Sequence, residues 1–303
     1  MLAVEVAGIK MKNPLILASG ILGLTKESME SIKAGAIVTK SIGKEERKGY
    51  KNPTFYDIGY GLLNAIGLAN PGIDEYIKEI KGIKVDVLIG SIFGKDSVEF
   101  GYLAKRMAPY VKAIEMNMSC PHAKKLGMEY PTEEIKNAVE ESKKAGLPVF
   151  VKLGMENLIE RAEKAIEGGA DGLVAINSIK AMTIDIDAKM PILGNKIGGY
   201  SGMAIKPIGI RCVYELASNF DLPIVGVGGI RNAKDVIEYM MAGAAAVQIG
   251  SALYYEGKEI FEKIENDLKI WLDKNGYGNI NDIVGIALKR WKNLRQKNII
   301  FRG

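Results

Sequence analysis

The sequence has very few residues that could hold a metal ion or a covalent cross-link. It contains two cysteines, Cys120 and Cys212, and a single histidine among 303 residues. Two cysteines cannot by themselves build a disulfide framework, a structural zinc site or an iron–sulfur cluster. No Ser-His-Asp arrangement and no metal-ligand spacing is present either. We therefore expect no metal site in this chain.

A broad basic surface is also missing. Lysine and arginine number 41 against 36 aspartates and glutamates, which gives a net charge of +5. Residues 288–303 hold six of the basic residues and no acidic one, so the rest of the chain is nearly neutral. Nucleic-acid binding usually requires a basic patch or stripe. We expect a solvated amphipathic helix at this tail and no nucleic-acid partner.

Long apolar segments and a secretory signal are absent as well. The longest stretches without charge are 58–73 and 239–255, and both fall short of the ~20 apolar residues that span a membrane. The first residues show no basic stretch followed by an apolar one. Because 48% of the residues are hydrophobic, the chain can still form a large core. We expect a soluble, cytoplasmic protein that does not contact membranes.

The chain does contain a regular alternation of strand-like and helix-like segments. The strand candidates are continuously apolar and β-branched, as strands buried on both faces should be. They occupy residues 13–19, 36–41, 85–91, 113–119, 148–154, 172–178, 223–229 and 246–251. The helix candidates occupy 26–33, 73–80, 95–108, 132–145, 156–168, 205–218 and 232–242. This alternation predicts an α/β fold, a single (β/α)8 TIM barrel domain over 1–303, with a doubly wound open sheet as the main alternative.

Segments outside the eight strand–helix pairs complete this picture. Residues 2–11 alternate apolar and polar side chains, which predicts an N-terminal β-hairpin that caps one end of the barrel. The chain after the eighth strand predicts a C-terminal helical extension. Long loops follow the second, fourth and sixth strands, at 42–72, 120–131 and 179–204. Barrel enzymes carry their chemistry at these carboxyl ends, so we expect the functional site there.

Two lysines interrupt otherwise apolar strands near their carboxyl ends. Lys40 lies in AIVTKS and Lys152 in PVFVKLG. A buried ammonium group is unfavourable unless an anion compensates its charge. The two lysines therefore indicate either an anionic ligand or a partner carboxylate, and we favour the ligand.

Glycines end the last two strands. Gly228-Gly229 and Gly250-Ser251 are placed where barrels commonly bind phosphate through backbone N–H groups. The segment GVGGIRN lacks the third glycine of a dinucleotide fingerprint, which rules out that motif. A phosphate together with an anion-stabilising lysine predicts a phosphorylated redox cofactor such as FMN.

The two cysteines have different surroundings. Cys120 follows the fourth strand at the expected mouth, where a thiol can act as a base once its surroundings favour the thiolate. Cys212 lies on one helical face with Ile208 and Leu216 and is expected in the core. His122 could tune Cys120, but we favour an ordinary loop residue.

Nine short motifs in order carry a family resemblance. They are ASG (18–20), TKS (39–41), NAIGLANPG (64–72), EMNMSCPH (115–122), VKLG (151–154), INS (176–178), GGYSGMAIKP (198–207), GVGGI (226–230) and IGS (249–251). Together they resemble class 1 dihydroorotate dehydrogenase, most closely its NAD-linked class 1B catalytic subunit. The match runs from about residue 3 to 255. NAIGL, the SCP turn and GG-x-SG-x-AIKP are its most specific parts.

The resemblance implies an FMN barrel that oxidises (S)-dihydroorotate to orotate in pyrimidine synthesis. Cys120 would be the catalytic base that removes the C5 proton while hydride passes from C6 to flavin N5. The residues that would contact FMN are Ser19, Lys40, Ser41, Ser91, Asn117, Lys152, Ile176, Gly202, Gly228, Gly229, Gly250 and Ser251. Those that would contact substrate are Lys40, Asn64, Ala65, Ile66, Gly67, Leu68, Asn117, Asn177 and Ser178.

Four positions depart from the family pattern. Ser91 stands where asparagine is usual, which puts that flavin contact in doubt, and Ser178 replaces threonine but keeps the hydroxyl. Tyr200 stands where leucine is common, and His122 where asparagine is common. None of these departures removes a residue that the reaction needs.

The class 1B resemblance also implies a partner. A separate subunit with FAD and a [2Fe–2S] cluster would pass electrons to NAD+, around a homodimer core within a heterotetramer. A fumarate-linked class 1A enzyme would be a second possibility, although NAIGLANPG argues against it. An FMN barrel that acts on a dihydropyrimidine or on dihydrouridine in RNA is another alternative, although the SCP turn and the NAIGL segment argue against both substrates. A non-redox phosphate-binding barrel is the last alternative, and it would leave Lys40, Lys152 and Cys120 without a role.

Overall fold

A computed structural model describes residues 1–21, 25–118 and 131–289 of the chain. Eight parallel strands close into a barrel in the order β10-β15-β16-β3-β4-β7-β8-β9. The strands are β3 (Leu15–Leu17), β4 (Ala36–Val38), β7 (Leu88–Ile92), β8 (Ala113–Asn117), β9 (Val149–Leu153), β10 (Gly172–Ala175), β15 (Ile224–Val227) and β16 (Ala246–Ile249). Each falls within or overlaps a predicted strand. The predicted TIM barrel is confirmed, and the open sheet is wrong because β16 pairs with β3.

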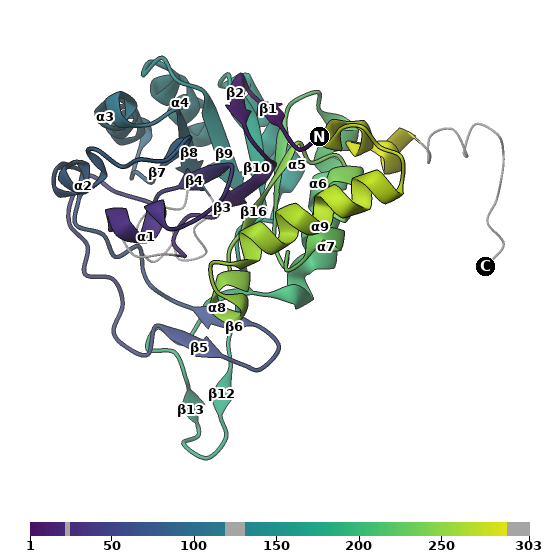
Figure 1. Ribbon diagram of the computed structural model, residues 1–303. Helices are drawn as coiled ribbons and strands as arrows, with labels where there is room; N and C mark the ends of the chain where they lie inside the picture. Colours follow the sequence, from purple (N-terminus) through teal and green to yellow (C-terminus); the bar gives the residue numbers. More distant parts are fainter. Residues whose placement is uncertain (22–24, 119–130, 290–303) are drawn as a thin grey trace.

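Helices surround the barrel and separate its strands along the chain (Figure 1). They are α1 (Lys26–Glu30), α2 (Ile73–Ile80), α3 (Ser97–Met107), α4 (Thr132–Lys143), α5 (Leu158–Glu167), α6 (Lys206–Asn219), α7 (Ala233–Met241), α8 (Ala252–Glu256) and α9 (Ile260–Lys274). Side-chain caps fix several starts: Asp96 accepts from the Glu99 amide at α3, and Asn232 forms a capping box with Asp235 at α7. Apolar faces of the helices pack on the strands and form one large core.

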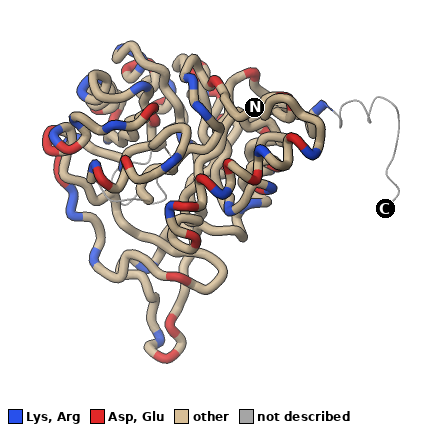
Figure 2. The backbone as a smooth tube through the Cα atoms, in the orientation of Figure 1, with Lys and Arg blue, Asp and Glu red and all other residues tan. Residues whose placement is uncertain are grey.

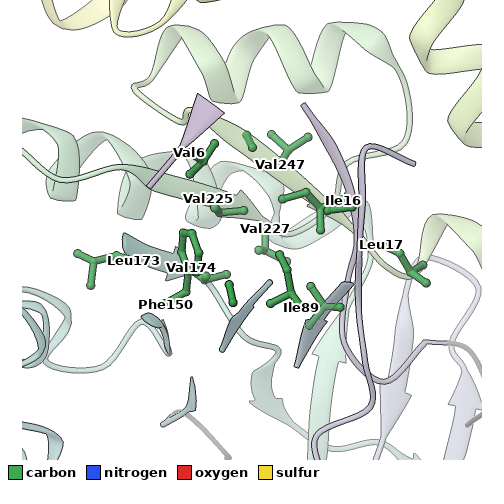
Figure 3. Close-up of a cluster of buried hydrophobic side chains, with 14 of the residues drawn as sticks. Val6, Ile16, Leu17, Ile89, Phe150, Leu173, Val174, Val225, Val227 and Val247 are labelled. Carbon is green, nitrogen blue, oxygen red and sulfur yellow. The ribbon is translucent and has the colours of Figure 1, made fainter. Parts of the chain in front are cut away.

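The N-terminal hairpin closes one end of the barrel, as predicted. Strands β1 (Val4–Val6) and β2 (Ile9–Met11) pair through a turn in which Ala7 and Gly8 adopt positive φ. Their side chains at Val6, Ile9 and Met11 line, with core residues of the barrel, a void of only about 10 Å³. Figure 3 shows Val6 among these buried apolar side chains. This end is a closed plug, and its lining is apolar except for Glu115 and Gln248.

The loops after the second and sixth strands contain strands that the sequence did not predict. Strands β5 (Phe55–Asp57), β6 (Leu62–Asn64), β11 (Ile179–Ala181) and β14 (Gly198–Ser201) form an antiparallel sheet in the order β11-β14-β6-β5. Strands β12 (Ile184–Asp185) and β13 (Met190–Pro191) form a hairpin that projects away from the barrel (Figure 1). These strands are two to four residues long, and β6 pairs with β14 from far along the chain, so no local period marks them.

Charged residues of both signs are distributed along the whole described chain (Figure 2). Among the described residues, no helix has the length and apolar character needed to cross a bilayer. The predicted amphipathic helix over 288–303 falls almost entirely outside the described residues. The C-terminal helical extension that the structure does describe is α9, followed by a short 3-10 helix at Ile280–Ile283.

Candidate active site

A cavity of about 510 Å³ opens at the carboxyl ends of the barrel strands, at the end of the barrel away from the N-terminal hairpin. Most of the predicted site residues line it, although they come from all parts of the chain. They are Ser19, Lys40, Ser41, Asn64, Ile66, Gly67, Leu68, Asn117, Lys152, Ile176, Asn177, Ser178, Gly228, Gly229, Gly250 and Ser251. The rule that polar residues at parallel strand ends meet in one place therefore located this site.

Four predicted site residues are not among those that line the cavity. Ser91 is fully buried behind Ser41, and Ala65 is fully buried beneath the small sheet. Gly202 lies just behind Gly229, because a Cβ on Gly229 would come within 2.9 Å of the Gly202 carbonyl oxygen. Cys120, together with His122, lies outside the described residues.

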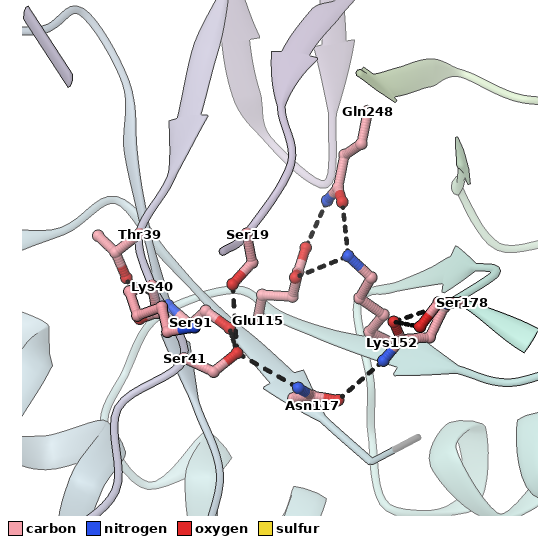
Figure 4. A network of polar contacts seen from close by, with 11 residues as sticks. Ser19, Thr39, Lys40, Ser41, Ser91, Glu115, Asn117, Lys152, Ser178 and Gln248 are labelled. Carbon is pink, nitrogen blue, oxygen red and sulfur yellow. Dashed lines mark hydrogen bonds and ion pairs between the residues drawn. The ribbon is translucent and has the colours of Figure 1, made fainter. Parts of the chain in front are cut away.

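Three serine hydroxyls form a chain from the cavity wall into the core (Figure 4). Ser41 Oγ lies 3.2 Å from Ser19 Oγ and 2.8 Å from Ser91 Oγ. The Ser91 amide donates to Thr39 Oγ1 at 2.9 Å, which fixes the strand behind it. Ser91 thus reaches the cavity through its hydrogen bond to Ser41, and its contact with a flavin stays a prediction.

Two asparagines are held in fixed orientations at the centre of the cavity. Asn117 Nδ2 donates to Ser41 Oγ at 3.3 Å, and its Oδ1 accepts from Asn177 Nδ2 at 3.4 Å. Asn177 Oδ1 in turn accepts from the Ser178 amide at 2.8 Å. Because each amide has a defined donor side and acceptor side, the cavity presents an ordered hydrogen-bonding surface.

Lys152 reaches the floor of the cavity from inside the barrel. Its amine donates to Gln248 Oε1 at 3.0 Å and lies 3.7 Å from Glu115 Oε1 (Figure 4). The preference for a ligand over a partner carboxylate therefore needs correction, since a buried carboxylate already compensates this lysine. An ammonium carries three N–H donors, and in the described part of the chain only one of them is hydrogen-bonded. Donors remain for a ligand.

Lys40 follows β4, three strands from β9 in the barrel, and its half-buried side chain also lines the cavity. A Cβ added to Gly20 would lie 3.7 Å from its Nζ, so the chain passes close to the amine at this point. Both lysines predicted from the strands thus face the same cavity, and neither side chain turns out to bulk solvent.

The ends of β15 and β16 form an anion cradle. Gly228 and Gly229 have φ of +128° and +70°, and a Cβ on Gly229 would clash with Lys206 at 2.8 Å. Tyr239 Oη donates to the Gly228 carbonyl at 2.7 Å and braces the turn from behind. Burial raises the pKa of Tyr239, so this hydroxyl keeps its proton and stays a donor. Gly228, Gly229 and Gly250 all line the cavity, and backbone N–H groups at the ends of such strands suit a phosphate.

The small antiparallel sheet lies over the cavity. Asn64, at the end of β6, lines the cavity and donates from Nδ2 to the Gly199 carbonyl at 3.3 Å. Gly199 itself permits close contact with the barrel, because a Cβ there would lie 2.1 Å from Ser178 Oγ. The sheet thus connects Asn64 to the serine and asparagine at the end of β10.

Sequence reasoning missed several residues of the site. Glu115 and Gln248 are buried polar residues within apolar strands, so the argument used for the lysines would have found them. Phe55 and Tyr254 line the cavity rim with ring centroids 5.2 Å apart. These aromatics belong to β5 and α8, whose positions no local pattern predicts.

Cys212 is confirmed as a core residue. It is fully buried on α6 with Leu216, and burial raises the pKa of its thiol. A thiol in this state is a poor nucleophile and base.

Comparison with known proteins gives consistent matches over nearly the whole chain. The family model described as dihydroorotate dehydrogenase matches residues 1–272. A protein of Methanocaldococcus jannaschii named dihydroorotate dehydrogenase B (NAD(+)), catalytic subunit, is 48% identical over 95% of this chain and 98% of its own length. Proteins of the same name from Pyrococcus horikoshii and Thermoplasma acidophilum are each 46% identical over 95% of this chain, with 98% and 99% of their own lengths covered.

Proposed function

This chain belongs to the dihydroorotate dehydrogenase family, in its NAD-linked class 1B branch, and on this premise we propose that residues 1–303 form one FMN domain that oxidises (S)-dihydroorotate to orotate in pyrimidine synthesis. The single observation that supports this most is the cavity at the carboxyl ends of the strands. It combines an ammonium with free donors, an ordered pair of asparagines and a glycine cradle for phosphate.

The residues of the cavity fit FMN. The backbone amides of Gly228, Gly229 and Gly250 suit its phosphate, and Lys152 suits the N1–O2 edge, where the reduced ring carries negative charge. Bound FMN would supply the hydride acceptor, its N5 atom. The further residues that would hold it are Ser19, Lys40, Ser41, Asn117, Ile176 and Ser251, with Ser91 and Gly202 behind them.

The substrate would lie between the flavin site and the small sheet. Asn64, Asn117 and Asn177 offer amide donors and acceptors that complement the ring amides of dihydroorotate. Lys40 and the Ser178 hydroxyl would complete the contacts, with the backbone of 64–68 around the carboxylate. Because Asn117 and Asn177 already hold each other, they would orient the ring with little loss of side-chain freedom.

We assign the base to Cys120, which would take the C5 proton as hydride leaves C6. A thiol suits this task near neutral pH because its ordinary pKa lies close to that range. Cys212 cannot substitute for it, since it is buried in α6.

The electrons would then leave through a partner. The relatives are named as catalytic subunits of an NAD(+)-dependent enzyme, which supports a separate electron-transfer subunit for this chain. We propose that this subunit carries FAD and a [2Fe–2S] cluster, in a heterotetramer around a homodimer of this chain. The two cysteines here could not hold such a cluster.

The reductive half-reaction tests this proposal. The purified protein should show a flavin spectrum close to one FMN per chain, and dihydroorotate should bleach it without oxygen present, while dihydrouracil should not. Bleaching by dihydrouracil alone would assign a different dihydropyrimidine. A colourless protein that does not take up added FMN would indicate a non-redox barrel and overturn the proposal.

A further inference from the structure

We propose that Glu115 and Gln248 are positioning residues that set how much positive charge Lys152 presents to the flavin. This inference rests on the proposed function. Neither residue belongs to the flavin or substrate contacts described above, except that Gln248 also lines the cavity. Both act through the lysine amine.

The three side chains meet inside the barrel from different strands. Glu115 lies on β8, Lys152 on the adjacent β9, and Gln248 on β16, three strands further round. Their exposed fractions are 0%, 6% and 2%. A carboxylate and an ammonium so deeply buried must compensate each other, because water does not reach them.

Gln248 keeps the two charges apart. Its Oε1 accepts from the Lys152 amine at 3.0 Å, so its Nε2 faces Glu115 Oε2 and donates to it. Glu115 Oε1 stands 3.7 Å from the amine and accepts no hydrogen bond from any described residue. The ion pair is therefore loose, and the amide holds the ammonium toward the cavity rather than against the carboxylate.

This arrangement has a consequence for a flavin above Lys152. Two electrons and one proton convert the neutral oxidised ring to an anionic reduced ring, which the ammonium stabilises. Glu115 opposes that effect, because its negative charge lies beside the same amine. Without Glu115 the ammonium would favour reduced flavin more strongly. Without Gln248 the ammonium could close onto Glu115 and favour it less.

The test measures the flavin reduction potential by anaerobic titration with a chemical reductant and a reference dye, at saturating FMN. We expect Glu115→Gln to raise the potential by about 30 mV, which is a tenfold change in the relative affinity for reduced flavin. In a Lys152→Met background, the same substitution should change nothing. Gln248→Met should lower the potential, and it tests the inference by itself if Glu115→Gln does not fold.

A matched control separates this role from general destabilisation. Asp171 also pairs with a lysine, Lys143, at 2.6 Å, but at the opposite end of the barrel, so Asp171→Asn should leave the potential unchanged. An unchanged or lowered potential in Glu115→Gln, or an equal rise without Lys152, would overturn the inference. Since the titration uses no dihydroorotate, a wild-type protein that dihydroorotate fails to bleach would contradict the proposed function alone.

Discussion

The two ends of this barrel differ in packing, although the same eight strands form both: the amino end is almost filled and the carboxyl end is open. At the amino ends, the hairpin β1–β2 and inward apolar side chains leave a void of about 10 Å³. At the carboxyl ends, the same strands open into a cavity of about 510 Å³ with two lysines and several amides. On β9 the change takes two residues, from Phe150 at the plug to Lys152 at the cavity. Packing residues and site residues thus follow one another along the strands, with Gln248 lining both spaces. Substitutions of the apolar plug residues and of the cavity residues should have separable effects.

The largest effect should come from the plug. Phe150→Ala should lower the free energy of unfolding by about 3–5 kcal/mol, because it removes a large buried side chain and leaves a cavity. Urea unfolding measures this change. The FMN affinity, measured well below the unfolding transition, should stay within about twofold of wild type. A large loss of flavin affinity in this variant would show that the two ends are not independent.

Cys120→Ser should show the opposite behaviour. The rate of flavin reduction by dihydroorotate at neutral pH should fall about 10²-fold or more, which is the scale of a lost general base. Stopped-flow absorbance measures this rate. FMN content and the urea midpoint should not change. Turnover like that of wild type would remove Cys120 from its assigned role.

Tyr239→Phe should have a smaller effect at the phosphate cradle. The hydroxyl braces the carbonyl groups of Val227 and Gly228, so its loss should weaken FMN binding by roughly tenfold, or about 1.4 kcal/mol. Fluorescence titration of the apoprotein with FMN measures the affinity. If affinity stays the same while stability falls, Tyr239 belongs with the packing residues.

Cys212→Ala should have the smallest effect of the four. It removes one buried sulfur atom from α6 and should cost about 1 kcal/mol of stability. The rate of flavin reduction should equal that of wild type, in contrast with Cys120→Ser. A reduced rate would show that the core beneath α6 also influences the cavity.

The sequence predicted the barrel well because its signals are local. Each barrel strand is a short apolar run, and α2 begins and ends at the residues predicted for it. The small sheet over the cavity was missed for the opposite reason. Strand β6 pairs with β14 although Asn64 and Gly199 lie 135 residues apart, and neither strand shows a clear alternation.

The site, like the fold, was predicted where its signals are local and missed where they depend on tertiary packing. Polar residues at strand ends identified Lys40, Lys152 and Asn117, because parallel strands end at one mouth. Glu115 interrupts an apolar strand as the lysines do, but its pairing with Lys152 could not be predicted, because the folded barrel brings the two side chains together. The aromatic rim of Phe55 and Tyr254 depends on how the small sheet packs, which is a tertiary effect.

The position of Lys152 also bears on how the chain assembles. Along β9, Phe150 and Lys152 point into the barrel, while Val149, Val151 and Leu153 alternate to the outside, where β9 contacts α4 and α5. A register shift of one residue in β9 would exchange the inward and outward side chains. It would bury the Lys152 ammonium in the apolar interface with the helices, without a counterion. Lys152, which is suited to bind an anion, therefore also destabilises folding intermediates in which β9 is out of register.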